Sequence, residues 1–302
     1  MAILRYTVAE RDDGRILKRV IRSEMGVSAH LLASAKAQGA ITVNGEIRYA
    51  DRKVFAGDVI EIAMEDRGEA PEPQEGPVDI VFMDDDIIIV NKPAPLPSVS
   101  SPRQSIETLE NRMAHYFRDE PNYTYRPVNR LDKGTSGLMV IARHQHAQNR
   151  MQALLHTDAF IRTYRAVVEG IPDPVSGTID RPIGKADGAT VKRVIDPVNG
   201  KPSVTIYETE RTGNGRALVR IRLMTGRTHQ IRVHMSSIGH PVTGDFLYGT
   251  EIPELPGRFA LHSSGIDLIH PMTGEKLHFE TPLPDELKRL LDIRPLPQGC
   301  LR

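Results

Sequence analysis

The sequence contains a single cysteine, Cys300, among its 302 residues. One cysteine excludes an internal disulfide framework and the cysteine-rich zinc sites of short Cys-x-x-Cys motifs. No run of 18 consecutive apolar residues occurs, so we expect no membrane-spanning helix. The first residues, MAILRYTVAERDDG, lack the apolar segment and the cleavage site of an export signal. These absences predict a cytoplasmic protein.

An excess of charge of either sign is also missing. The chain carries 39 basic and 39 acidic side chains, and its formal net charge is zero. Any contact with nucleic acid must therefore depend on local basic patches. No G-x-G-x-x-G follows a strand and no Walker A lysine is present, so we expect no nucleotide cofactor. The absence of G-x-S-x-G argues against an esterase-type serine nucleophile.

The composition divides the chain into three parts. Residues 1–64 predict a small unit of two helices and a hairpin. Residues 65–77, EDRGEAPEPQEGP, are acidic and proline-rich, which predicts an extended linker. In residues 78–302 strands mostly follow strands. This part predicts an α+β fold with a mixed, mostly antiparallel sheet and helices packed against it.

Basic side chains recur in the small unit. Arg15, Lys18, Arg19 and Arg22 stand at i, i+3, i+4 and i+7, so a helix would align them in one stripe. That stripe is either a solvated helix face or a surface that binds phosphates. A second helix over 29–39 is expected to end at its glycine, and the Asn-Gly pair at 44–45 predicts a tight turn between two strands.

Three further segments of the larger unit have clear patterns. The spacing predicts helices over 103–117 and 145–157, and GLMVIAR, residues 137–143, predicts a buried strand. The glycine-rich segment 184–202 is basic and predicts an irregular loop or hairpin. Its lysines and arginines could reach phosphates, although a plain surface loop fits the same pattern.

A helix is also expected within residues 225–249, TGRTHQIRVHMSSIGHPVTGDFLYG. Ile231, Met235 and Ile238 fall at i, i+4 and i+7, which favours a helix that Thr228 caps at its start and Gly239 ends.

The same segment holds His229, His234 and His240. Their spacings of five and six residues do not place ligands on one helix face. Capping and core hydrogen bonds are the expected roles, and no metal is predicted.

Three side chains are candidates for chemistry. Arg232 falls in the first turns of the expected helix, against the macrodipole preference, so an anionic partner is expected. Asp132 is one candidate, although an ordinary ion pair is equally consistent. Tyr164 shares a strand face with Arg162 and Ala166 and is either a core side chain or a ring that stacks on a base.

Four motifs together resemble one enzyme family. NRLDKGTSGLMVIAR, TYRAVVEG, GRTHQIRVHMSSIGHPVTGDFLYG and LHSSGIDLIHPMTGEKLHFETPLP resemble the RluA family of RNA pseudouridine synthases in order and spacing. The resemblance covers about residues 78–285. The phrases ITVNG and AGDVIEI resemble the alpha-L RNA-binding domain of ribosomal protein S-four, which is often attached to enzymes of this family.

The family resemblance implies a site for isomerising uridine in RNA without a cofactor. It implies that Asp132 is the reactive carboxylate and that Arg232 pairs with it. Tyr164 would pack on the flipped uracil, with Leu131 and Ile231 as apolar contacts. The resemblance further implies that Arg130 fills the space that the flipped base leaves.

One residue departs from the family pattern, which usually has histidine before Arg-Leu-Asp where this chain has Asn129. The expected partner is RNA, large-subunit ribosomal RNA rather than transfer RNA, and the expected state is a monomer. One alternative is a non-catalytic RNA-binding or assembly protein on the same fold. A base deaminase is a further alternative, but the single cysteine excludes its usual zinc site.

Overall fold

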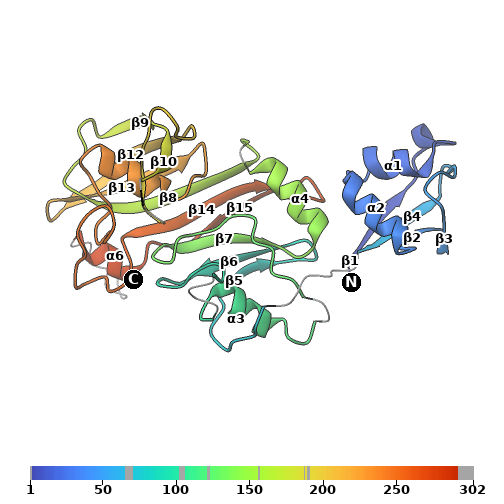
Figure 1. Cartoon of the computed structure of the whole chain (residues 1–302), viewed down its shortest axis with the longest axis horizontal. Coiled ribbons are helices and arrows are strands. Elements are labelled where there is room, and N and C mark those ends of the chain that lie inside the picture. The colour runs from blue at the N-terminus through green and yellow to red at the C-terminus, as the bar shows by residue number, and fades with distance from the viewer. Residues whose placement is uncertain are drawn as a thin grey trace, which may run out of the picture.

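The computed structural model describes residues 2–64, 71–101, 106–120, 123–155, 157–186, 188 and 191–291. A four-stranded sheet lies near the N-terminus, and a nine-stranded sheet and a two-stranded ribbon lie in the remainder. The small sheet and its helices occupy one end of the long axis in Figure 1. Throughout the described residues, every helix is too short or too polar to span a membrane.

The small sheet is antiparallel, with the order β1-β4-β2-β3. Its strands are β1 (Ala2–Thr7), β2 (Ile41–Val43), β3 (Glu46–Ile47) and β4 (Val59–Met64). Asn44 and Gly45 both have positive φ, 53° and 82°, and they form the predicted hairpin turn. Strand β1 was not predicted from the sequence, although all six of its residues pair with β4.

Two helices cover this sheet, α1 (Leu17–Ser23) and α2 (Ala29–Ala37), after a short 3-10 turn η1 (Glu10–Asp12). Gly39 follows α2 with φ of 63°, so the predicted end of this helix is confirmed. The small unit has its own core of buried apolar side chains. Met272, from the larger unit, packs against that core.

The predicted basic stripe is wrong at its first residue. Arg15 precedes α1, and its guanidinium pairs with the buried carboxylate of Asp12 and, at 3.1 Å, with Glu24. The other three members, at positions 18, 19 and 22, do lie on α1 and are exposed. The available basic face is therefore formed by Lys18, Arg19 and Arg22.

The large sheet confirms the predicted α+β class. Its order is β5-β6-β7-β14-β8-β13-β12-β9, with β15 also paired to β14. Among the described strands of this sheet, β7 and β14 pair in parallel and the other pairs are antiparallel. The strands are β5 (Ile80–Met83), β6 (Ile87–Lys92), β7 (Ser136–Ala142), β8 (Phe160–Glu169), β9 (Ser176–Asp180), β12 (Val204–Gly213), β13 (Arg216–Leu223), β14 (Leu261–Ile269) and β15 (Lys276–Glu280). In the basic segment, β10 (Ile183–Lys185) and β11 (Arg193–Ile195) form a hairpin.

Four helices accompany the large sheet: α3 (Leu109–Tyr116), α4 (Gln145–Leu154), α5 (Gln230–Ser237) and α6 (Asp285–Arg289). The prediction of a helix from residue 103 is wrong at its start, part of which lies outside the described residues. Thr108 and Asn111 form a capping box that begins the helix at Leu109. Helix α4 begins at the predicted residue and ends at Leu154.

The second half of the predicted linker packs against α3. Residues 65–70 lie outside the described part, whereas 71–77 have no regular secondary structure. The Gln74 amide donates to the Asn111 carbonyl at 3.0 Å, and Asn111 Nδ2 donates to the Glu72 carbonyl at 2.8 Å. Arg112 also donates to the Pro77 carbonyl. These bonds attach residues 72–77 to the larger unit.

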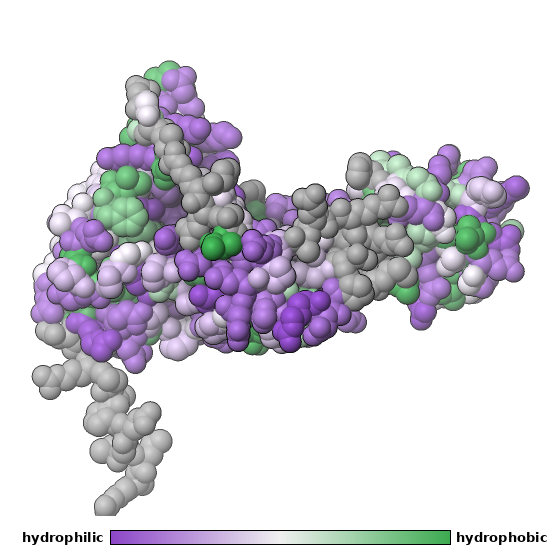
Figure 2. Space-filling model, turned by 60° about the horizontal axis from the view of Figure 1, so that its bottom comes forward, coloured by the Kyte–Doolittle hydropathy of each residue, from purple (hydrophilic) through white to green (hydrophobic). Residues whose placement is uncertain are grey.

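Strand β7 is buried on both faces of the sheet. Met139 and Ile141 belong to one apolar cluster, and Leu138, Val140 and Ala142 belong to the other. Such a strand cannot shift without disturbing both clusters, so it holds the chain that enters it in place. On the face shown in Figure 2, hydrophilic side chains predominate and the hydrophobic ones form small separate spots.

Gly137→Ala is expected to destabilise the fold strongly. A Cβ at this position would lie 2.2 Å from the Ser263 carbonyl oxygen of β14, and its φ is +109°. We expect the free energy of unfolding in urea to fall by at least about 3 kcal/mol. Gly265→Ala on β14 is the control, since its Cβ would meet Thr163 at an ordinary 3.5 Å. Equal effects of the two substitutions would contradict the close packing of β7 on β14.

Candidate active site

The loop that carries Asp132 is fixed before it enters β7. Ser98 Oγ donates to the Leu131 carbonyl at 2.7 Å and accepts from the Leu131 amide at 3.1 Å. The Leu96 amide donates to the Lys133 carbonyl at 2.9 Å. These backbone contacts on either side of Asp132 give its carboxylate a defined position while leaving the side chain 29% exposed.

Arg232 lies on the first turn of α5. The expected anionic partner, Asp132, is confirmed, and Asp245 is a second one. Arg232 Nη1 donates to Asp132 Oδ2 at 3.1 Å. Its Nε and Nη2 donate to Asp245 at 2.6 and 2.8 Å in a bidentate pair. The pKa of Arg232 lies above its usual range: burial lowers it, but the contacts with Asp245 and then Asp132 raise it further. Sequence reasoning did not find Asp245, which shares no periodic pattern with Arg232.

Three aromatic rings surround the Arg232 guanidinium. The ring centroids of Phe259, Tyr248 and Phe246 lie 4.1, 5.0 and 5.7 Å from its central carbon. Cation–π contacts of this kind strengthen when the cation is desolvated, and Arg232 is only 3% exposed. The guanidinium is therefore held by charge and by packing.

A cleft of about 480 Å³ opens beside Asp132. Its lining includes all six of the large-unit site residues expected from the sequence: Arg130, Leu131, Asp132, Tyr164, Ile231 and Arg232. The volume falls within the range of small-molecule pockets, about 300 to 1,000 Å³. The structure thus brings together segments of the chain that are 100 residues apart.

The cleft has an apolar interior and a charged rim. Tyr164, Leu131 and Ile231 are buried, with 4%, 6% and 4% of their surface exposed. Burial raises the pKa of Tyr164, so its hydroxyl keeps its proton at neutral pH. Arg130 is exposed at the rim, and within the described chain no carboxylate is paired with it. The cleft can therefore enclose a planar ring between apolar side chains while the Arg130 guanidinium stays at the rim.

Two buried polar residues support the loop. Asn129 is the residue that departs from the family pattern. Its Oδ1 accepts a hydrogen bond from the Val140 amide of β7 at 2.9 Å. Lys92 is fully buried, and its Nζ donates to the Leu96 carbonyl at 2.6 Å. Burial, followed by the charge of Arg258, lowers the pKa of Lys92 to about 7, while the charge of Asp132 raises it. Sequence reasoning did not find Lys92.

The three histidines of residues 225–249 have separate surroundings. His234 contacts Thr205 Oγ1 at 2.8 Å and the Arg181 carbonyl at 2.9 Å, which confirms the expected core hydrogen bonds. His240 contacts the Glu169 carbonyl. His229 faces the cleft and precedes α5, so the prediction that Thr228 caps this helix is wrong. Gly239, with φ of 86°, follows the helix as predicted.

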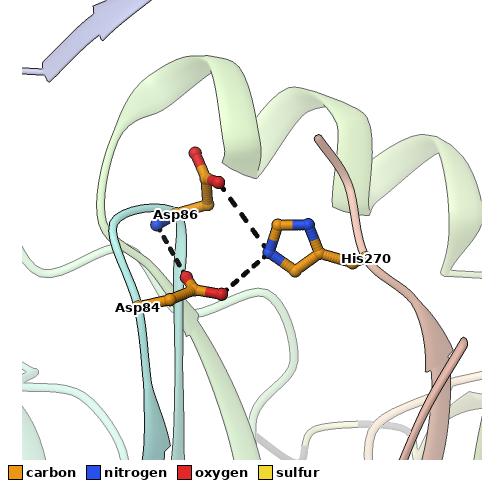
Figure 3. A group of neighbouring side chains, drawn as sticks. All are labelled: Asp84, Asp86 and His270. Carbon is orange, nitrogen blue, oxygen red and sulfur yellow. Dashed lines mark hydrogen bonds and ion pairs between the residues drawn. The ribbon is translucent and has the colours of Figure 1, made fainter. Parts of the chain in front are cut away.

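Asp84, Asp86 and His270 form a second cluster of metal-ligand types (Figure 3). His270 Nδ1 accepts the amides of residues 272 and 273, so its proton is on Nε2, which donates to Asp84 Oδ2 at 2.9 Å. A metal on Nε2 would move that proton to Nδ1, against two backbone donors. His144 also binds Asp86 through Nε2 while its Nδ1 accepts a backbone amide. The cluster therefore joins the turn between β5 and β6 to the turn after β14 by hydrogen bonds.

Comparisons with known proteins decide the family. A family described as RNA pseudouridylate synthase matches residues 86–237. The chain is 38% identical over 268 residues to ribosomal large subunit pseudouridine synthase D of Vibrio parahaemolyticus, covering 82% of this chain and 81% of that protein. The chain belongs to the RluA family of RNA pseudouridine synthases. This RluA-family enzyme is an isomerase that acts on uridine in RNA.

Two further relatives agree with this membership. The enzyme is 34% identical over 272 residues to the uncharacterized RNA pseudouridine synthase YjbO of Bacillus subtilis, covering 89% of this chain and 95% of that one. Among solved structures, human RNA pseudouridylate synthase domain containing 1 is 26% identical with a TM-score of 0.59. That match covers 78% of this chain and 94% of the human one.

Asp245→Asn is expected to slow isomerisation by at least about 10-fold at saturating RNA, because the buried Arg232 loses its bidentate partner and its fixed position. The measurement is the single-turnover rate constant, together with unfolding in urea. Asp84→Asn is the matched control. It weakens the hydrogen bond to His270 at one end of β6, whereas Lys92 and the Asp132 loop lie at the other end. Both variants should lose stability, and only Asp245→Asn should lose activity. Equal rates in the two variants would contradict a role for Asp245 in the cleft.

Proposed function

We propose that this enzyme isomerises uridine in large-subunit ribosomal RNA and that Asp132 is its reactive carboxylate. Relatives named ribosomal large subunit pseudouridine synthase D support the choice of RNA. No observation on this chain favours transfer RNA instead. The geometry that carries the proposal is a carboxylate that lines a cleft, is partly exposed and is paired with a buried arginine. Since its expected substrate is ribosomal RNA, we also propose a cytoplasmic location.

The reaction needs one carboxylate and no added reagent. The bond between the ribose and N1 of uracil breaks, the base turns, and a new bond forms through C5. Asp132 attacks the sugar, adds to the pyrimidine ring, or removes a proton from the ribose, and every route requires its charged form. Arg232 positions the carboxylate through the 3.1 Å hydrogen bond. Asp245 contributes by holding Arg232 in place.

The remaining cleft residues have proposed roles in binding the base. A uridine must leave its stack to reach Asp132. Tyr164, Leu131 and Ile231 offer an apolar space of the right kind for a planar ring. Arg130, exposed at the rim, is the side chain that would occupy the vacated stack. Its exposure leaves it free to change rotamer when RNA binds.

Asp132→Asn is expected to abolish product formation while leaving RNA affinity unchanged. The amide has nearly the same shape but is neither a nucleophile nor a base. The measurements are single-turnover product formation and RNA binding. Asp119→Asn, at a side chain that is 90% exposed, is the control and should behave like the wild type. An Asp132→Asn protein that kept about a tenth of the wild-type rate would contradict the assignment.

We propose that residues 1–64 form an RNA-binding domain, with a basic face on α1. Lys18, Arg19 and Arg22 are exposed on this helix, whereas Arg15 is already paired with carboxylates. Each phosphate that such a side chain neutralises adds a salt-dependent increment to affinity. We also propose that the enzyme is a monomer.

Changing Lys18, Arg19 and Arg22 together to glutamine is expected to weaken RNA binding more than chemistry on bound RNA. The slope of log affinity against log salt concentration should shrink by about 2 to 3 units if each side chain neutralises one phosphate. Arg15→Gln is the matched control: it should lower the free energy of unfolding and leave the slope unchanged, because Arg15 is held by Asp12 and Glu24. An unchanged slope in the triple variant would mean that α1 is only a solvated face.

A further inference from the structure

His229 occupies a strained position beside the reactive carboxylate. It is the N-cap of α5 with φ of 59° and ψ of 18°, a left-handed conformation that is uncommon for residues with a side chain. Such backbone strain costs about 1 to 3 kcal/mol and is concentrated at functional sites. The side chain lines the cleft, and its Nε2 lies 3.9 Å from Asp132 Oδ2. That distance is too long for a hydrogen bond.

The hydrogen bonds around His229 fix which ring nitrogen carries the proton. The Arg193 amide donates to the Tyr248 hydroxyl at 2.8 Å, and that hydroxyl lies 2.8 Å from His229 Nδ1. With its own proton directed at Nδ1, the Tyr248 hydroxyl accepts one hydrogen bond and donates one. The opposite tautomer would make that hydroxyl accept twice and would turn the Nε2 lone pair toward the carboxylate of Asp132. The proton of the neutral ring is thus on Nε2, facing the cleft.

The surroundings of His229 also keep it neutral. Burial is the largest influence and lowers its pKa, while the charge of Asp132 raises it. The charges of Arg232 and Arg193 lower the pKa further, and that of Asp245 raises it. The net direction is downward, so the ring is uncharged at neutral pH. A neutral imidazole with a directed N–H is suited to polarising a carbonyl group.

The reaction creates a need for such a donor. When the bond between C1′ and N1 breaks, both of its electrons stay with the pyrimidine, and negative charge spreads over N1 and the two carbonyl oxygens. Addition of Asp132 to the ring would also place negative charge on a carbonyl oxygen. In every route the negative charge passes from Asp132 to the base, because the carboxylate forms an ester or takes up a proton as the base becomes electron-rich. A preorganised donor at that point stabilises the transition state.

We propose that His229 is a further catalytic residue, which donates its Nε2–H to a uracil carbonyl oxygen as the base takes up negative charge. This inference rests on the proposed role of Asp132. The hydrogen bond transfers no proton. The base turns, C5 bonds to C1′, and the loss of a proton at C5 is balanced by the gain of one at N1. Tyr248 acts through His229 and is a positioning residue.

The test compares two substitutions at position 229. Both side chains must adopt the same left-handed backbone, but only one of them has an N–H that can donate a hydrogen bond into the cleft. His229→Leu removes the donor and should reduce the single-turnover rate at saturating RNA by roughly 100- to 1,000-fold. His229→Gln places an amide N–H near the position of Nε2 and should recover the rate to within about 10-fold of wild type. RNA affinity should stay close to wild type in both, and any loss of thermal stability should be similar in both, because Leu and Gln must adopt the same left-handed backbone.

Nitrogen-15 NMR of the full-length protein at neutral pH gives an independent readout that needs no active variant. The signal absent from His229→Gln identifies His229, and it should have the shifts of the tautomer protonated on Nε2. In Tyr248→Phe the population protonated on Nδ1 should rise and the rate should fall. A wild-type ring protonated on Nδ1, or on both nitrogens, would overturn the inference even if His229→Leu does not fold.

The rates separate this inference from the proposal for Asp132. An active Asp132→Asn protein would remove the proposed role of Asp132. An inactive Asp132→Asn protein, together with a His229→Leu rate within about 3-fold of wild type, would overturn only the role of His229. Equal losses in His229→Leu and His229→Gln would also overturn it, because they would indicate that the imidazole shape matters and not its N–H.

Discussion

The buried charge of Arg232 is the constraint on which the cleft depends. A guanidinium that is only 3% exposed needs compensating charge, since its removal from water is otherwise strongly unfavourable. Asp245, fully buried, provides that charge through two hydrogen bonds. Asp132 therefore makes one hydrogen bond to Arg232 and keeps part of its surface in the cleft. With both carboxylates ionised, Arg232, Asp132 and Asp245 carry a net charge of −1. Asp132 is the member of this group that is exposed in the cleft.

The loop around Asp132 is held by polar side chains from several segments. Ser98 binds the Leu131 carbonyl, and Lys92 binds the Leu96 carbonyl. Asn129 accepts a hydrogen bond from the Val140 amide of β7. Each such bond contributes only about 1 kcal/mol, but a buried partner left without it would cost more. The loop thus has one well-defined conformation because its alternatives leave buried groups unpaired. This explains how a partly exposed carboxylate can lie on a rigid frame.

Local patterns in the sequence were sufficient for much of the fold and for part of the site. Strand β7, helix α5 and the hairpin at Asn44 follow from periodicity and turn chemistry over a few residues. The pairing of Asp132 with Arg232 spans 100 residues. The position of Arg232 in its helix made Asp132 one candidate partner, and the family resemblance singled it out.

The missed features depend on contacts that no short pattern encodes. Asp245 meets Arg232 across a turn, and Arg15 is neutralised by partners that only the fold brings close. From its spacing, His229 was expected to cap a helix or to make a core hydrogen bond, and not to bind a metal. Its position beside Asp132 depends on its left-handed backbone and on the hydroxyl of Tyr248, 19 residues away in the sequence.

The attachment of residues 72–77 to α3 limits how far the N-terminal unit can travel. Strand β4 ends at Met64, and the first anchored carbonyl is that of Glu72. Eight residues of fully extended chain reach at most about 28 Å. Under the proposal that α1 binds RNA, its basic face has a high effective concentration near the larger unit. The distance between an RNA segment bound at α1 and a uridine in the cleft is then limited by the length of chain between the two units.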